Sequence, residues 1–241
     1  MGKSRKGRQG FIYSPMSDLT PLNSANVNDI VKIESAPPWI VVDHAKHKII
    51  LTNWPGVLWA VEVVEPAPDT DQVTDWYTRS TAIRLIEQSS TTELFGKYGE
   101  NVERILDSAA SLQLSSHLNS QPIDPSVEEL YSDGWTRWLK TQQLESYADN
   151  HRRTLAMEFR ESPIGPGLLL VSTVIDKRAQ ELEGDAAFAI DDEGEIFLVP
   201  RWMRVSDAAR HAAMANGAPH LFSTEERAKM TACWHEITNA P

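Results

Sequence analysis

Cysteine is almost absent from this chain of 241 residues, in which Cys233 is the only one. A single thiol can form neither an internal disulfide nor a structural zinc site built on two or more thiolates of this chain. This cysteine usage is typical of proteins that work in a reducing compartment.

Long apolar stretches are missing as well. No run of about 18 apolar residues occurs, so the sequence predicts no membrane-spanning helix. Only Phe11, Ile12 and Tyr13 separate the basic start of the chain from Ser14-Pro15. This segment is too short for the apolar core of a signal peptide, and we therefore expect a cytoplasmic protein.

Positive charge is scarce, because 23 lysines and arginines stand against 34 aspartates and glutamates, a net charge of −11. The first ten residues are basic, whereas the rest of the chain is acidic. An acidic body repels duplex nucleic acid and attracts basic proteins. We therefore expect a basic protein partner, no duplex nucleic acid on the acidic body, and only a weak contact with nucleic acid through the basic start.

Local signatures of catalysis and cofactor binding are absent too. The sequence contains no G-x-G-x-x-G loop, no Walker lysine, no G-x-S-x-G elbow and no H-E-x-x-H helix. We therefore predict no cofactor, and we assign no catalytic residue. His44 and His47 favour a polar connection over a zinc site, because residues three apart on a strand point to opposite faces.

An enzyme, either a hydrolase or a transferase, stays open as an alternative, because a site assembled from scattered residues leaves no local signature. Its candidate residues are His211, His220 and Cys233. His235 is a poor partner for Cys233, since residues two apart on a helix lie about 200° apart around the axis. Apolar residues three before and four after this cysteine favour a place on a buried helix face.

The N-terminal part of the chain is predicted to form strands. Residues 1–26 are predicted as a basic flexible tail, because glycines and prolines interrupt them without any periodicity. Short β-forming runs then predict an antiparallel meander of four strands at 30–33, 39–42, 49–51 and 57–64. Trp54-Pro55-Gly56 predicts a type II turn in which the glycine takes a positive φ.

After the predicted strands, apolar residues recur at the spacing of helices. Ala82, Leu85 and Ile86 predict one helix, and Ser90 with Glu93 has the spacing of a capping box before a second. Later elements are helices from Asp124-Pro125 onward and over 168–182, 206–216 and 223–237, and a hairpin of 187–190 with 196–199.

This order of elements predicts an α+β fold, in which an N-terminal antiparallel β-meander packs with a helical middle region and a mixed helix and hairpin C-terminal region. A break rich in glycine and proline at 162–167 divides the folded part. Residues 27–160 then hold the meander and helices, and residues 161–241 form a helix-hairpin-helices region packed on the rest as one globule.

The predicted partner-binding residues are acidic or aromatic. Four carboxylates crowd the hairpin turn without the alternating pattern of a calcium loop, and two tryptophans lie outside the periodic apolar patterns. These residues are Asp191, Asp192, Glu193, Glu195, Trp54 and Trp202. They predict a non-catalytic acidic module that captures a basic protein, as an immunity protein or an adaptor does. A structural component of a larger assembly, held through the basic start, is a further alternative.

Overall fold

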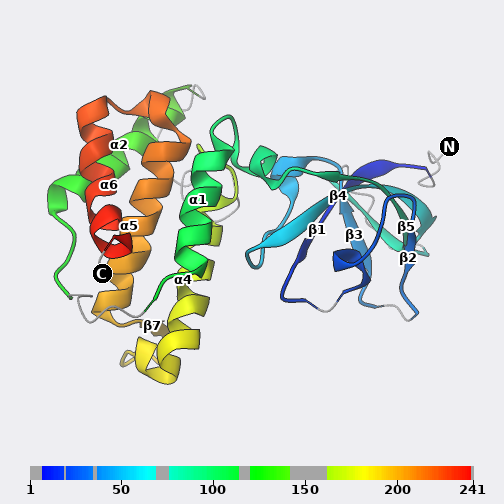
Figure 1. Ribbon diagram of the computed structural model, residues 1–241, viewed down its shortest axis with the longest axis horizontal. Helices are drawn as coiled ribbons and strands as arrows, with labels where there is room; N and C mark the ends of the chain where they lie inside the picture. Colours follow the sequence, from blue (N-terminus) through cyan, green and yellow to red (C-terminus); the bar gives the residue numbers. More distant parts are fainter. Residues whose placement is uncertain are drawn as a thin grey trace. The chain divides into compact units, whose positions relative to one another are not determined.

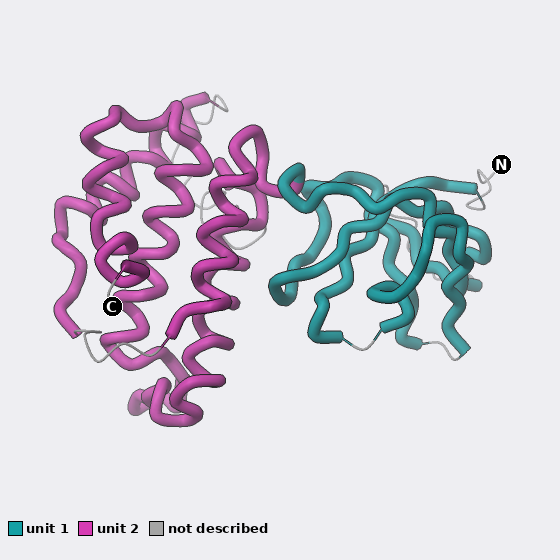
Figure 2. The backbone as a smooth tube through the Cα atoms, viewed as in Figure 1, with its two compact units in different colours: residues 1–93 teal, residues 94–241 magenta. Residues whose placement is uncertain are grey.

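The computed structural model describes residues 7–18, 20–34, 37–68, 76–113, 120–141 and 162–239 (Figure 1). The chain divides into two compact units, unit 1 with residues 1–93 and unit 2 with residues 94–241 (Figure 2). Unit 1 consists mainly of strands, and unit 2 of helices with one short hairpin. The predicted α+β fold class is therefore confirmed. The predicted division between residues 160 and 161 falls outside the described residues and stays a prediction.

Unit 1 is an antiparallel sheet that closes on itself. Strand β1 pairs with β3 and β4, and β5 also pairs with both β3 and β4, so these four strands form a ring. Strand β2 extends the sheet beside β5. The strands are β1 (Gln9–Pro15), β2 (Ile30–Lys32), β3 (Ile40–Asp43), β4 (Gly56–Pro66) and β5 (Tyr77–Ser89). The 3-10 turns η1 (Pro21–Asn23), η2 (Lys46–Lys48) and η3 (Thr91–Phe95) lie between or after them.

The core of this barrel-like sheet follows from alternation along β4. Trp59, Val61 and Val63 all point inward, as their spacing of two along a strand requires, and each is at most 4% exposed. The Trp59 indole donates a hydrogen bond from Nε1 to the carbonyl oxygen of Leu22 at 3.2 Å. Trp59 is therefore part of the core of unit 1.

The predicted flexible tail is wrong for residues 9–15, which form β1. This strand pairs with β4 from Gln9 to Pro15, and the partner strand supplies hydrogen bonds that the local sequence does not reveal. Gly10 belongs here for a packing reason, because a Cβ at this position would lie 2.4 Å from the carbonyl oxygen of Asp43. Residues 1–6 lie outside the described part of the chain.

The predicted helix around Ala82 is also wrong, because the segment is strand β5. Its inward positions change phase in the middle, from Ser80 and Ala82 to Ile83 and Leu85. The change coincides with a bulge in the pairing with β4, where Val63 lies opposite Ile83 and Glu65 lies opposite Ala82, so that β4 contributes one extra residue. The hydroxyl of Ser80 satisfies the carbonyl of Glu65 in this bulge at 2.7 Å.

Two smaller predictions in unit 1 need correction. Residues 49–51 form no strand, although Ile49 and Leu51 are buried. Gly56 begins β4 without a positive φ, and the Trp54–Pro55 peptide bond is cis, so the turn is not of type II. The glycine instead leaves room for the Tyr13 ring, which a Cβ would approach to 2.3 Å.

Unit 2 is arranged around one central helix, α5. Among the described residues of this unit, α5 packs against each of the other four helices, as Figure 1 shows in the left-hand part of the view. Its buried surface carries five alanines, whose small side chains let several helices approach closely. The helices are α1 (Gly99–Ala110), α2 (Pro125–Thr141), α4 (Gly167–Glu183), α5 (Pro200–Gly217) and α6 (Thr224–Thr238). The short elements are η4 (Gly184–Ala187), β6 (Phe188–Ile190), β7 (Ile196–Leu198) and η5 (Pro219–Leu221).

Most helix ends in unit 2 agree with the sequence prediction. α2 begins after Asp124, and α4 ends at Gly184 with a φ of 59°. Two starts were wrong, because α1 begins at Gly99 rather than at the spacing of Ser90 and Glu93, and α5 begins at Pro200 rather than near residue 206. Proline suits the first turn of α5, since its missing N–H has no partner there.

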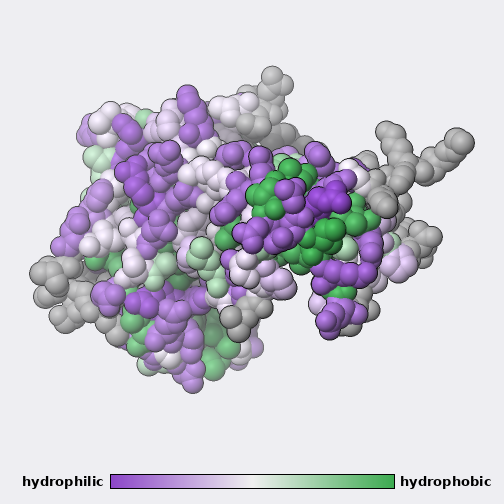
Figure 3. Space-filling view, turned by 45° about the vertical axis from the view of Figure 1, so that its right-hand side comes forward, coloured by the Kyte–Doolittle hydropathy of each residue, from purple (hydrophilic) through white to green (hydrophobic). Residues whose placement is uncertain are grey.

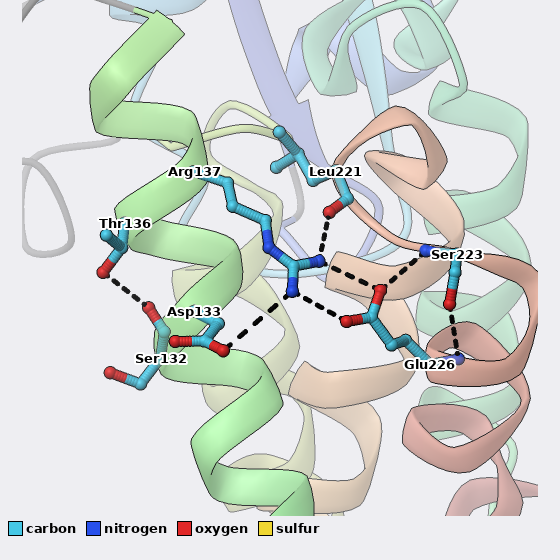
Figure 4. A network of polar contacts seen from close by, with 7 residues as sticks. All are labelled: Ser132, Asp133, Thr136, Arg137, Leu221, Ser223 and Glu226. Carbon is cyan, nitrogen blue, oxygen red and sulfur yellow. Dashed lines mark hydrogen bonds and ion pairs between the residues drawn. The ribbon is translucent and has the colours of Figure 1, made fainter.

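α6 begins with a capping box, which also joins α6 to α2 (Figure 4). The hydroxyl of Ser223 accepts from the backbone N–H of Glu226, whose carboxylate accepts from the backbone N–H of Ser223. Arg137 donates to both oxygens of that carboxylate and, at 2.7 Å, to the carbonyl of Leu221. These hydrogen bonds from Arg137 and Ser223 lower the pKa of Glu226 to about 2.

Candidate partner-binding surface

The predicted acidic turn joins β6 and β7 in an antiparallel hairpin, as expected. Ile190 pairs with Ile196 directly before and after the turn. The Asp191 carboxylate accepts hydrogen bonds from the backbone N–H groups of Glu193 and Glu195, both at 2.9 Å. Gly194 takes a φ of +84°, which glycine adopts without steric cost. Asp191 therefore shapes the turn, and the other three carboxylates project from it.

Exposure sets this hairpin apart from the rest of unit 2. Asp192, Glu193 and Glu195 are exposed, and the cross-strand pair Ile190 and Ile196 is 69% and 70% exposed. Figure 3 shows hydrophobic and hydrophilic side chains next to one another at the lower end of unit 2, where Figure 1 places β7. Exposed apolar side chains rimmed by polar residues make this hairpin a candidate surface for protein contact.

The base of the hairpin is fixed to the helical unit. Leu198 and Ala187 are buried, and the backbone N–H of Val199 donates to the carbonyl of Ala187 at 2.9 Å. One residue later α5 begins. The surface formed by Ile190, Asp192, Glu193, Glu195, Ile196 and Phe197, here called the hairpin tip, is therefore presented on a rigid support.

The sequence analysis missed the apolar half of the hairpin tip. Both strands are apolar at nearly every position, so their pattern predicts a hairpin without indicating which face is buried. The sequence signal was the number of large apolar side chains, because a hairpin with two strands of three residues cannot bury Ile190, Ile196 and Phe197 at once. Phe197 is 41% exposed.

The two tryptophans predicted as exposed anchors are buried instead. Trp54 is 8% exposed in unit 1, and Trp202 is fully buried at the start of α5. Trp202 lies in the same unit as the acidic turn but in its interior, and Trp54 belongs to the other unit. Trp202 looked irregular because the predicted helix began too late to include it, whereas on the real α5 it lies three residues before buried Val205.

The three residues considered for an enzyme site have different surroundings. The Cys233 thiol is half-buried on α6 beside Arg204 and Glu236, and burial raises its pKa, which disfavours the reactive thiolate. His220 is exposed in η5. Neither histidine is among the groups that set the pKa of the thiol.

His211 is the most unusual titratable group of unit 2. Its side chain is 1% exposed, its ring centroid lies 4.8 Å from that of Tyr131 in a tilted arrangement, and Nε2 is 3.4 Å from a carboxylate oxygen of Glu128. Burial lowers the pKa of His211 to about 4, an effect that Asp207 opposes and Arg210 reinforces. The imidazole is therefore neutral at physiological pH and serves as part of the packed interior.

The described residues contain neither a group of metal-ligating side chains nor a helix able to cross a membrane. Nowhere in that part of the chain do three His, Cys, Asp or Glu side chains form a group that could hold a metal ion. Nε2 of His44 lies 2.9 Å from Oγ1 of Thr78, and His47 is exposed on η2. In the same part of the chain, none of the helices has the length and apolar character needed to cross a bilayer.

Comparison with known proteins gives no relative: no family model, no curated protein and no solved structure matches this chain significantly.

Proposed function

We propose that this protein is a non-catalytic acidic module that captures a basic protein partner through the hairpin tip, in the manner of an immunity protein or an adaptor. The observation that carries the proposal is the exposed pair of Ile190 and Ile196 directly beside three projecting carboxylates. The single cysteine fits a reducing cytoplasm as its place of action.

Charge is concentrated in the unit that carries the hairpin. Unit 2 has 14 basic and 23 acidic residues, whereas unit 1 has 9 and 11. Such a field attracts a basic partner from a distance and raises the association rate, particularly at low salt. The carboxylates of Asp192, Glu193 and Glu195 then select for lysine and arginine at the point of contact.

Affinity needs a desolvated apolar contact in addition to charge. Exposed carboxylates remain hydrated and contribute little to the lifetime of a complex. Ile190 and Ile196 lose their water when a partner covers them, whereas Phe197 lies on the opposite face of the hairpin. They take the anchoring role that the sequence analysis gave to Trp54 and Trp202.

The enzyme alternative has no comparable support. Its three candidates do not form a hydrogen-bonded nucleophile and base in the described part of the chain, and the surroundings of Cys233 disfavour the thiolate. The structural-component alternative depends on the basic start, of which residues 1–6 lie outside the described residues. The protein-binding function therefore rests on the larger set of observations.

Site-specific crosslinking tests the proposal. A photo-reactive amino acid replaces Ile196 in the full chain, and a matched control carries it at Glu129, an exposed position on α2. Irradiation in a lysate of the native host is expected to give one dominant adduct at position 196 only, with a protein of basic isoelectric point.

Competition with unlabelled protein completes this test. Unlabelled wild-type chain should abolish the adduct, whereas a chain with Ile190→Ser and Ile196→Ser should not compete. An adduct pattern shared by both positions, an acidic partner, or full competition by the double variant would contradict the proposal.

A further inference from the structure

A second exposed surface lies on unit 1 and is independent of the hairpin tip. Phe11 on β1, Asp43 on β3 and Tyr77 on β5 are direct neighbours across the sheet. Directly opposite residues share one face, and the neighbouring Val42 and Thr78 are buried, so this row points outward. Trp76, the residue before β5, is 64% exposed, the largest ring so displayed in the described part of the chain.

Each ring of this surface has a cation close to it. Nζ of Lys46 lies 5.0 Å from the centroid of Phe11, and Nζ of Lys48 lies 5.0 Å from that of Trp76. The guanidinium carbon of Arg79 lies 5.8 Å from the centroid of Tyr77. Both lysines belong to η2, which begins two residues after the end of β3. This short connection keeps the lysines close to the rings.

We propose that this aromatic and cationic surface binds single-stranded nucleic acid. The exposed Trp76 ring and the half-buried Tyr77 ring offer π-faces on which unpaired bases stack, and the two lysines of η2 neutralise the phosphates that connect those bases. Unit 1 suits a polyanion better than unit 2 does, because its 9 basic residues nearly balance its 11 acidic ones.

The acidic neighbours of the surface define how a strand would lie. Asp43 stands between two of the rings, and Glu93 forms an ion pair with Lys46. Phosphates therefore pass along the side of η2, while the bases face Tyr77 and Trp76. A duplex is excluded by the same geometry, since its bases are already stacked and paired.

The surface also has an apolar border. Val41 is the cross-strand neighbour of Arg79 and is 42% exposed. An apolar border beside rings fits the faces and sugars of unpaired nucleotides, and the cations distinguish it from an aromatic groove for a proline-rich peptide.

Fluorescence anisotropy of the full chain with a labelled oligothymidylate of about 15 nucleotides tests the proposal at low salt, about 50 mM. Trp76→Ala is expected to weaken binding by about 5- to 100-fold, the range found when a stacking ring is removed. Lys46→Ala with Lys48→Ala should reduce the slope of log affinity against log salt by about 1.4, that is, two phosphate contacts. Asp43→Asn should strengthen binding.

Matched variants separate this surface from general charge effects. Lys177→Ala with Lys229→Ala removes two exposed lysines of unit 2 and should leave the affinity and the slope unchanged. Circular dichroism confirms that each variant is folded. Equal binding of a duplex, equal losses in both lysine pairs, no change with Trp76→Ala, or preferential binding of a proline-rich peptide would overturn the proposal. None of these outcomes bears on the hairpin tip, so the two proposals fail independently.

Discussion

Replacing Trp202 with alanine is expected to lower the free energy of unfolding of unit 2 by about 3–5 kcal/mol, the usual cost of truncating a buried aromatic ring. The ring is fully buried on the central helix α5, which contacts the other four helices in the described part of the unit. A domain of this size is stable by only about 5–15 kcal/mol, so the variant should unfold at far lower urea concentration.

Met203→Ala provides the matched control for this prediction. Its side chain is the next one on the same helix and is 46% exposed, so the substitution should shift stability by less than about 1 kcal/mol. Urea unfolding followed by circular dichroism at the helix wavelength measures both variants. If Trp202→Ala left the stability unchanged and abolished partner binding, the prediction would be wrong and Trp202 would be a binding residue.

Acidification is expected to destabilise unit 2 through His211. Its pKa is about 4 in the folded chain and about 6.5 in the unfolded chain. Between these two values the unfolded state binds more protons, so stability is intact above pH 6.5 and falls as the pH drops toward 4. The difference in pKa corresponds to a loss of up to about 3 kcal/mol.

A variant without the ionisable ring isolates this effect. His211→Gln should remove most of the decline between pH 6.5 and 4, measured by urea unfolding at a series of pH values. Glu226 works in a lower window, because its pKa of about 2 is below the ordinary value, so its stabilisation is lost only as the pH falls from about 4.5 toward 2. Identical pH profiles of the wild type and His211→Gln above pH 4 would contradict the buried, neutral state of this histidine.

The helices could be predicted from the sequence more fully than the barrel-like sheet. Helix ends in unit 2 are encoded locally, as in the capping box of Ser223 and Glu226 or at Gly184, and so can be recognised from neighbouring residues. The ring of strands depends on β1 and β5, whose hydrogen bonds come from distant segments. In β5 the buried positions also change phase beside the bulge, which left Ala82 and Leu85 at a spacing that resembles a helix.

Only part of the candidate site could be predicted from the sequence, again because tertiary packing decides the rest. Carboxylates such as Asp192 and Glu193 are almost always exposed, so their place on the surface follows from their chemistry. Whether Trp202 or Ile196 is exposed depends on which other elements cover it, and this is decided by tertiary packing. The sequence therefore indicated that the carboxylates are exposed, whereas the exposure of Ile196 and the burial of Trp202 follow only from the packing.

The association rate constant of the captured partner, measured against salt concentration, tests the central claim most directly. The hairpin variant carries Asp192→Lys, Glu193→Lys and Glu195→Lys and keeps Asp191, whose carboxylate holds the turn. The control carries Glu100→Lys, Glu129→Lys and Glu225→Lys, the same change in net charge at exposed helix positions. The proposal predicts that the hairpin variant associates at least about tenfold more slowly than the control at low salt, with the difference shrinking below about threefold at 0.5 M salt. Equal rates for the two variants at every salt concentration would contradict capture through the hairpin tip.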